Sequence, residues 1–455
     1  MSSQPREYLI YFAQIHETFR KAELDSLSQL TGVEIQWKEY SDDVSVTLAY
    51  EKEKESPFAI VHLSNNPSAK ALVERSILAK AVYELWGTGP DYDHLHATVK
   101  SQTPYLWPSC MSRSFKFEIE CYNGKRKQSA QREIIESFAY LGLDGEIKMK
   151  GPEITFTVLE EFPEKLATPT RVFFGRRVGG GSRALVEKYD LKKRHYIGTT
   201  SMDAELALVT ANIALVAPGK IVFDPFVGTG SFVVSCAHFG GSCLGSDIDG
   251  RQIRGKDGRS VLSNFQQYGL VGNYLDGFVS DLTNTPIRQT AFIDAIVCDP
   301  PYGVREGLKV LGSRDPEKGK EPVIRGGVLR HLQDDYVPPK RPYSFLAMLD
   351  DIMQFAADHL VPGGRLCFWM PTANEDFSQL DIPSHPHLQL VSVCVQEFNK
   401  WSRRLITYSR IQGDAQALPT RERGERNGGK KATADELNSF RKKYFEGFRS
   451  SGTQN

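Results

Sequence analysis

The stretch DPFVGTGS, residues 224–231, follows directly after the apolar run KIVF, residues 220–223. The apolar run predicts a short buried strand, and the glycines after it allow the backbone to approach a ligand closely. Residues 231–238 then predict a helix whose first amide groups point toward the same turn. A strand, a glycine-rich turn and a helix begin a βαβ unit, so this stretch predicts a parallel sheet covered by helices.

Two acidic residues lie where the next strands of that sheet would end. Asp247 follows Gly228 by nineteen residues and closes the apolar run 243–246, which places it to accept ribose hydroxyls. Asp281, in Val-Ser-Asp-Leu, lies at the expected end of a third strand and can accept from an adenine amino group. The turn lacks a full GxGxxG, and no basic residue suits a 2′-phosphate. An adenosine-bearing ligand without pyrophosphate therefore fits better than a nicotinamide dinucleotide.

A second motif, DPPYG at residues 299–303, follows the predicted strand 293–298. Two prolines after an acid make a rigid turn with few free amides. The Asp299 carboxylate and the Pro300 carbonyl can both accept from one exocyclic amine, which turns the nitrogen lone pair out of the base plane. Tyr302 offers a flat face on which a base can stack. This arrangement suits methyl transfer to an amine, because such a reaction needs mainly positioning and electrostatic stabilisation.

The rest of the chain predicts further strands and helices. Strands are also expected at 242–246 and 365–370, with a hairpin of 388–397 and 405–411 around Trp401. The N-terminal half predicts two small α+β units. For the first we expect strands at Tyr8–Ala13, Val44–Ala49 and Phe58–Leu63, and helices at Phe19–Leu30 and Ser68–Trp86. For the second we expect strands at 115–121, 146–149 and 154–159 and a helix at 129–141.

Composition and charge exclude several classes of protein. Lys+Arg and Asp+Glu are both 56, which argues against a generic polycation, although residues 165–195 hold nine basic residues against two acids. That stretch is either a solvated linker or a phosphate-binding joint between domains. The seven cysteines show no CxxC spacing, which argues against a disulfide framework or a zinc site and favours a reducing compartment, the cytoplasm. No signal peptide or membrane span is expected.

Together with YIGTTSMDAEL at residues 196–206 and GSDID at 245–249, these motifs give the chain a family resemblance. It resembles the THUMP-containing tRNA guanosine N2-methyltransferases of eukaryotes and archaea, which modify the guanosine at the tenth tRNA nucleotide. The resemblance covers most of 1–410 and is strongest over 171–303. It implies a class I S-adenosylmethionine-dependent methyltransferase with a Rossmann-like, seven-stranded, mostly parallel sheet. The division it implies is a ferredoxin-like domain 1–104, a THUMP RNA-binding domain 105–170, a basic linker 171–197, a methyltransferase domain 198–411 and a basic extension 412–455.

The resemblance also implies roles for individual residues. Asp299, Pro300 and Tyr302 would be catalytic, with Asp299 accepting from the guanine N2 amine. The cofactor S-adenosylmethionine would be bound by Thr199, Ser201, Met202, Asp224, Phe226, Gly228, Gly230, Asp247, Ile248, Asp281 and Leu282. No metal ligand is expected. The implied partners are tRNA and a small zinc-binding methyltransferase activator subunit, which would form a heterodimer with this chain and cover apolar surface.

Other interpretations stay open at this point. The DPPY turn also serves N6-adenine methyltransferases of RNA or DNA, because adenine presents an exocyclic amine too. A protein-glutamine methyltransferase usually has Asn in place of Asp299, and a tRNA-binding protein that has lost catalysis would not need the intact acids. The chain departs from the family in a long irregular insert, 306–342, expected to be a lid or disordered. Its basic tail beyond Gln412 would be either an accessory RNA contact or disordered.

Overall fold

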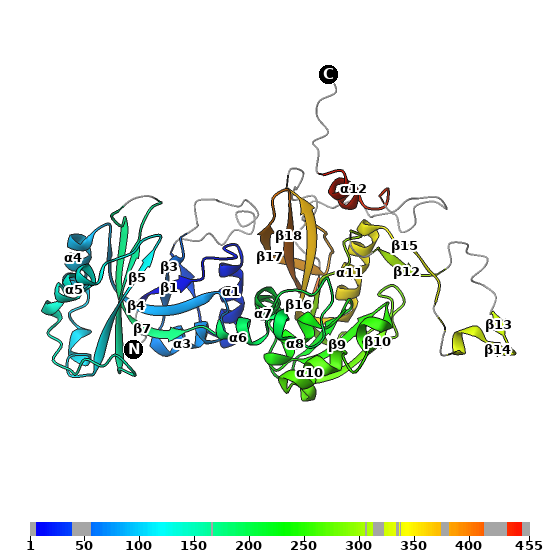
Figure 1. The fold of residues 1–455 in the computed structure, drawn as a ribbon, viewed down its shortest axis with the longest axis horizontal. Coiled ribbons are helices and arrows are strands. Elements are labelled where there is room, and N and C mark those ends of the chain that lie inside the picture. The colour runs from blue at the N-terminus through cyan, green and yellow to red at the C-terminus, as the bar shows by residue number, and fades with distance from the viewer. Residues whose placement is uncertain are drawn as a thin grey trace, which may run out of the picture. The chain divides into compact units, whose positions relative to one another are not determined.

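The computed structural model describes residues 6–38, 56–164, 167–304, 307–312, 323–333, 336, 338–374, 382–413 and 435–447. Within these ranges the chain forms two compact units, which meet in sequence at Arg183 and Ala184 (Figure 1). Across the same ranges, no helix combines the length and the apolar character needed to cross a membrane.

The first unit contains a single seven-stranded sheet. Its main elements are β1 (Arg6–Phe12), α1 (Phe19–Thr31), β2 (Gln36–Trp37), β3 (Phe58–Leu63), α3 (Asn66–Glu74), β4 (Ala79–Gly89), α4 (Tyr92–Gln102), β5 (Phe115–Tyr122), α5 (Gln128–Glu136), β6 (Ile154–Glu161) and β7 (Arg171–Gly180). The strand order is β2-β3-β1-β4-β7-β6-β5. The long strand β4 pairs with β1 on one side and with β7 on the other, so both α+β halves share one sheet.

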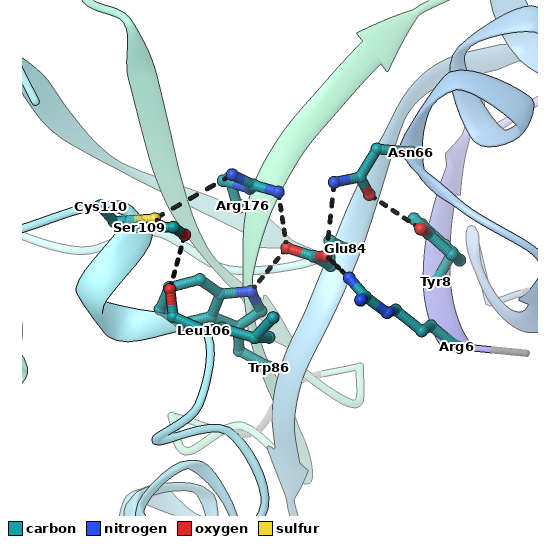
Figure 2. Close-up of polar contacts among 9 residues, drawn as sticks. All are labelled: Arg6, Tyr8, Asn66, Glu84, Trp86, Leu106, Ser109, Cys110 and Arg176. Atoms are coloured by element: carbon teal, nitrogen blue, oxygen red, sulfur yellow. Dashed lines mark hydrogen bonds and ion pairs between the residues drawn. The ribbon is translucent and has the colours of Figure 1, made fainter. Parts of the chain in front are cut away.

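A buried carboxylate joins the strands at the middle of this sheet (Figure 2). Glu84 on β4 is 1% exposed and accepts from Arg6 of β1 at 3.2 Å and from Trp86 Nε1 at 3.0 Å. Arg176 of β7 forms an ion pair with it at 3.0 Å. Since hydrogen bonds to a charged group are the strong ones, this cluster fastens β1 and β7 to β4.

Three expectations for this unit were wrong. The expected strand 146–149 is reduced to an isolated bridge between Ile147 and Phe115. The expected helix Ser68–Trp86 ends at Glu74, and the chain then enters β4. The reason is distant in sequence: the buried Glu23 carboxylate accepts from the amides of Ile77 and Leu78, at 2.8 and 3.0 Å, and so stabilises a turn there. The expected linker 171–197 is also not uniform, because its first ten residues are strand β7 inside the sheet. The expected strand Val44–Ala49 lies outside the described residues.

The second unit carries the glycine-rich turn. Its main elements are α6 (Ala184–Lys188), α7 (Ala204–Ile213), β8 (Ile221–Asp224), α8 (Ser231–His238), β9 (Ser242–Asp247), α9 (Gly250–Arg254), α10 (Val261–Tyr268), β10 (Tyr274–Val279), β11 (Ile293–Cys298), β12 (Lys309–Leu311), β13 (Ile324–Arg325), β14 (Val328–Leu329), β15 (Lys340–Pro342), α11 (Phe345–His359), β16 (Leu360–Ala373), β17 (Leu388–Glu397), β18 (Trp401–Arg410) and α12 (Ser439–Phe445). Their seven-stranded sheet has the order β10-β9-β8-β11-β16-β18-β17, and only β18 runs against its neighbours.

This topology confirms the predicted mostly parallel sheet, its strands and the terminal hairpin. From β8 the chain first builds outward through β9 and β10, and then crosses to the other side of β8 to form β11. Ligands of open parallel sheets bind at the carboxyl ends of the strands, where the order reverses in this way. Cys236, Cys243 and Cys298 are fully buried, as expected for small core residues.

The expected insert and tail are only partly within the described ranges. In the insert, β12 pairs with β15 and β13 pairs with β14, each as a two-stranded antiparallel sheet. In the tail, residues 414–434 and 448–455 lie outside the described residues. The part between them, residues 435–447, contains α12.

Candidate active site

Four aspartates lie at the carboxyl ends of four neighbouring parallel strands. Asp224 ends β8, Asp247 ends β9, Asp281 follows β10, and Asp299 follows β11. Asp224 is 1% exposed, and burial raises its pKa well above the usual range. The nearby charges of Asp247 and Asp299 raise that pKa further, so these three carboxyl groups form one acidic site.

Asp247 holds the glycine-rich turn between β8 and α8. Gly228 and Gly230 have positive φ angles, 49° and 87°, which glycine adopts without the steric cost of a side chain. The Gly228 amide donates to Asp247 Oδ2 at 3.0 Å. A Cβ placed on Gly228 would meet no atom closer than 3.9 Å, so this side of the turn is open to a ligand.

Backbone amides orient Asp224 and Asp247. Asp224 Oδ1 accepts from the amide of Phe226 at 2.9 Å, and the half-buried Phe226 ring packs against the core. Asp247 Oδ1 accepts from the amide of Asp249 at 2.8 Å. A carboxylate has about four acceptor positions, so Asp247 can still accept hydroxyl groups of a ligand after bonding the Gly228 and Asp249 amides.

The segment before α7 lies against the same turn. The Ser201 hydroxyl is 2.8 Å from the Thr229 hydroxyl, Met202 is buried and Thr199 is exposed. Behind them the fully buried Asn264 of α10 connects the two stretches of chain: it donates to the Thr229 carbonyl at 3.1 Å and bonds both backbone groups of Tyr196. Asn264 could not be predicted from the sequence, because nothing in a helix sequence marks an asparagine that hydrogen-bonds distant backbone groups.

The insert after the DPPYG motif reaches the acidic edge of the sheet. Asp281 is buried, and it accepts from the amide of Thr283 at 2.9 Å and from the amide of Leu311 in β12 at 2.6 Å. Lys340 of β15 donates to the carbonyl of Ile248 at 3.0 Å. Next to Asp281, Leu282 packs against the core. The β12–β15 pair is therefore part of the site's wall, which the sequence analysis did not predict.

Side chains hold Asp299, the acid of the DPPYG motif. Tyr302 donates its hydroxyl proton to Asp299 Oδ1, and Arg403 Nη1 lies 4.0 Å from Oδ2. Burial and the Asp299 charge raise the pKa of Tyr302 well above its usual value, so the hydroxyl stays protonated and acts as the hydrogen-bond donor. Pro300, which follows Asp299 in the sequence, is buried. The Asp299 side chain is 19% exposed.

Arg403 is a second residue that sequence reasoning missed. It is on β18, its guanidinium carbon lies 5.3 Å from the centre of the Trp369 ring and 5.7 Å from that of Phe398, and it donates to Gln396. These contacts fix a cation near Asp299. Only the pairing of β16 with β18 brings Arg403 to this end of the sheet.

The site suits a ligand of particular chemistry. Its side chains are mostly hydrogen-bond acceptors with negative charge, Asp224, Asp247, Asp281 and Asp299 among them, and the turn offers an open glycine face. A ligand with a pyrophosphate would be repelled by these carboxylates. S-adenosylmethionine fits these acceptors. Its sulfonium and ammonium groups carry positive charge, and its ammonium, ribose hydroxyl and adenine amino groups are hydrogen-bond donors.

Comparison with known proteins agrees with this geometry. The family model described as the Tmrp11 THUMP N-terminal domain matches residues 6–183, and that of the RMKL-like methyltransferase domain matches residues 192–311. The fold and the site thus define a class I S-adenosylmethionine-dependent methyltransferase preceded by a THUMP region.

Individual relatives narrow the class to a family. The tRNA (guanine(10)-N(2))-methyltransferase of Saccharomyces cerevisiae is 45% identical over 454 residues, which cover 97% of this chain and 100% of the relative. The enzyme of the same name from Schizosaccharomyces pombe is 40% identical over 89% of both chains. The one from Gallus gallus is 34% identical over 97% of this chain and 95% of its own. The chain belongs to the tRNA (guanine(10)-N(2))-methyltransferase family.

Proposed function

We propose that this chain transfers a methyl group from S-adenosylmethionine to the exocyclic N2 amine of guanosine 10 in tRNA. The observation that carries this proposal is the partly exposed Asp299 carboxylate, placed by the Pro-Pro turn beside the glycine-rich turn at the point where the strand order reverses. The relatives named for the same reaction match nearly the whole chain.

The cofactor would be held by the acidic edge of the sheet. Asp224, Gly228 and Gly230 would contact its methionine part, with Thr199, Ser201, Met202 and Phe226 around them. Asp247 and Ile248 would contact the ribose, and Asp281 and Leu282 the adenine. When bound, the cofactor supplies an electrophilic methyl group. The backbone bonds of Asp247 and Asp281 support these roles, because they fix each carboxylate before a ligand arrives.

Asp299 would orient the amine that receives the methyl group. Its carboxylate and the Pro300 carbonyl would accept the two N–H bonds of guanine N2, which directs the nitrogen lone pair away from the base plane. In the structure Tyr302 donates to this carboxylate, so its hydroxyl must give way to the incoming amine while its ring packs on the base. As the nitrogen took the methyl group and the bond from that carbon to the cofactor sulfur broke, Asp299 would accept the surplus proton from the nitrogen.

The test of this role separates chemistry from binding. Asp299→Ala is expected to abolish methyl transfer while tRNA affinity, measured by filter binding, stays within about twofold, since the side chain contributes little contact area. Tyr302→Phe keeps the ring and loses only the hydroxyl, so it is expected to retain most activity. If Asp299→Ala lost tRNA binding and methyl transfer together, the assigned role would be wrong.

We also propose that residues 6–183 bind tRNA. This unit matches the THUMP N-terminal domain model, and that match supports contact with tRNA. None of the seven cysteines, all of which the structure describes, forms a disulfide, which supports a cytoplasmic location.

The edge of the catalytic sheet offers a docking site for the proposed activator subunit. Among the described residues β10 is the last strand on its side of the sheet, so its outer edge can pair with a strand of another chain. Leu275 and Val279 on β10 are 53% and 50% exposed, and Val271 just before it is 46% exposed. We infer that the small zinc-binding subunit adds a strand here and covers these side chains.

Co-expression tests this docking site. Leu275→Asp is expected to stop the subunit from co-purifying with the chain, because a charge would be buried in the interface. Ile147→Asp, at a side chain that is 69% exposed in the first unit, is the matched control and is expected to leave the complex intact. Equal recovery of the subunit with both variants would place its docking surface elsewhere.

A further inference from the structure

The end of the described chain lies against the catalytic turn. Asn438, which is 2% exposed, donates from Nδ2 to the carbonyl of Tyr302 at 2.8 Å. Arg441, on the first turn of α12, donates from Nη1 to the carbonyl of Gly303. Both acceptors belong to the DPPYG turn, although they are more than 130 residues away in sequence: Asn438 follows Tyr302 by 136 residues and Arg441 follows Gly303 by 138.

The DPPYG turn, residues 299–303, has few amide groups of its own that could stabilise it. Pro300 and Pro301 have no amide hydrogen, so this stretch cannot tie itself down through its own N–H groups. Gly303 has φ +77°, and a Cβ at this position would lie 2.7 Å from Asn438 Nδ2. The glycine of the motif therefore both adopts a left-handed conformation and leaves room for the Asn438 amide to approach.

The segment that carries these two residues is itself anchored to the catalytic unit. The carbonyl of Leu437 accepts from the amide of Phe345 at the start of α11, at 3.1 Å. Phe440 is buried, and its ring centre lies 5.7 Å from that of Trp401 at the start of β18. Asp435 pairs with Arg441 at 2.9 Å and directs its guanidinium group. The contacts made to the turn thus come from a fixed element.

We propose that Asn438 and Arg441 are positioning residues for methyl transfer: they hold the Tyr302 and Gly303 carbonyls and so fix where Asp299 and Pro300 present their acceptor oxygens. Neither residue would touch the reacting atoms. The inference rests on the proposed role of Asp299 and adds the C-terminal segment to the machinery of that site. A displacement of the acceptor turn by even an ångström is costly, since reaction needs the amine in line with the methyl group.

The two roles of Asn438 can be separated by substitution. Its Oδ1 accepts from the amide of Arg441 at 2.9 Å and caps α12, while its Nδ2 holds the turn. Asn438→Asp and Asn438→Ser keep a good helix cap and remove the Nδ2 donor. We expect both to lower kcat about tenfold or more, with the S-adenosylmethionine Kd, measured by calorimetry, within about twofold of the original. Ser439→Ala, at the exposed neighbour, is the control and is expected to leave kcat unchanged.

A second measurement does not depend on activity. Hydrogen exchange of the Tyr302, Gly303 and Val304 amides is expected to be faster in Asn438→Asp and in Arg441→Lys than in the original chain, because the turn loses a restraint. Full kcat and unchanged exchange in Asn438→Asp and Asn438→Ser would overturn the proposal and leave Asn438 as a helix cap alone. Failure of the original chain to methylate guanosine N2 would instead refute the proposed function, so the two failures are distinguishable.

Discussion

Asn264 offers the sharpest test of how the cofactor side of the site is built. It is fully buried on α10 and makes three hydrogen bonds to backbone: it accepts from the amide of Tyr196 at 3.0 Å, and it donates to the carbonyls of Tyr196 and Thr229 at 2.8 and 3.1 Å. Asn264→Ala removes all of them at once. The segment that leads to Ser201 and the turn that contains Thr229 would then lose their common support.

The size of the effect follows from these contacts. A hydrogen bond in a protein contributes about 1 kcal/mol net, and its loss costs more where water cannot replace it, so three buried bonds correspond to about 3 kcal/mol. For a unit of this size, 1 kcal/mol shifts Tm by about 2–4 °C, which predicts a fall of about 6–12 °C in the unfolding of the catalytic unit. We expect the S-adenosylmethionine Kd to rise about tenfold, because the wall of its site is no longer fixed.

Gln267 supplies the matched control one turn along the same helix. It also hydrogen-bonds the backbone just before Tyr196: it accepts from the amide of His195 at 2.8 Å and donates to the carbonyl of Lys193 at 2.7 Å. Both of these hydrogen bonds are exposed to solvent. Gln267→Ala should therefore lower Tm by only about 2 °C and leave the Kd unchanged, since water replaces the lost bonds. Scanning calorimetry and titration calorimetry give both quantities. Equal effects of the two substitutions would refute the reasoning, because burial is what distinguishes the residues.

Three further predictions concern charges and units. Burial raises the pKa of Asp224 in the folded state. Its contribution to stability is therefore most favourable below about pH 4, where Asp224 is protonated in both the folded and the unfolded state, and that contribution falls as the pH rises toward the raised pKa. Asp224→Asn should therefore raise Tm at pH 7 and weaken cofactor binding. Glu84→Gln should destabilise the first unit by about 3 kcal/mol, because Arg176 loses a buried counter-ion. A chain that begins at Ala184 should bind S-adenosylmethionine as before and tRNA much more weakly.

Each of these has a measurement that can contradict it. For Asp224→Asn, calorimetric scans from pH 4 to pH 8 should show a stability gain that grows with pH; a constant difference would mean that burial of the charge does not matter. Glu7→Gln is the control for Glu84→Gln: its partner Lys38 is 48% exposed, so a loss under about 1 kcal/mol is expected. For the shortened chain, loss of cofactor affinity would show that the two units do not act independently.

The catalytic sheet could be predicted because its signals are local. A short apolar run, a glycine turn and an acid at the end of the next strand occur within a few dozen residues, and the structure has β8, β9 and α8 where the pattern places them. The hairpin expected for 388–397 and 405–411 likewise formed, as β17 and β18. In these segments, local preference and tertiary packing agree.

The features that were missed depend on contacts between distant parts of the chain. The expected helix Ser68–Trp86 gave way to β4 because Glu23, more than fifty residues earlier, binds the amides at the turn and because β1 and β7 pair with β4. Arg403 on β18 and Asn438 at the start of α12 reach the DPPYG turn only in the folded chain. Neither has a sequence neighbour that marks it, so no local pattern could predict its place in the site.

The identity of the methylated nucleoside decides whether this chain methylates guanosine N2. The chain, together with the activator subunit, would be incubated with unmodified tRNA and methyl-labelled S-adenosylmethionine, and the digested nucleosides identified by mass. The account predicts label in N2-methylguanosine, lost when guanosine 10 is replaced by adenosine. Label in N6-methyladenosine instead, or N2-methylguanosine that persists without guanosine 10, would contradict it.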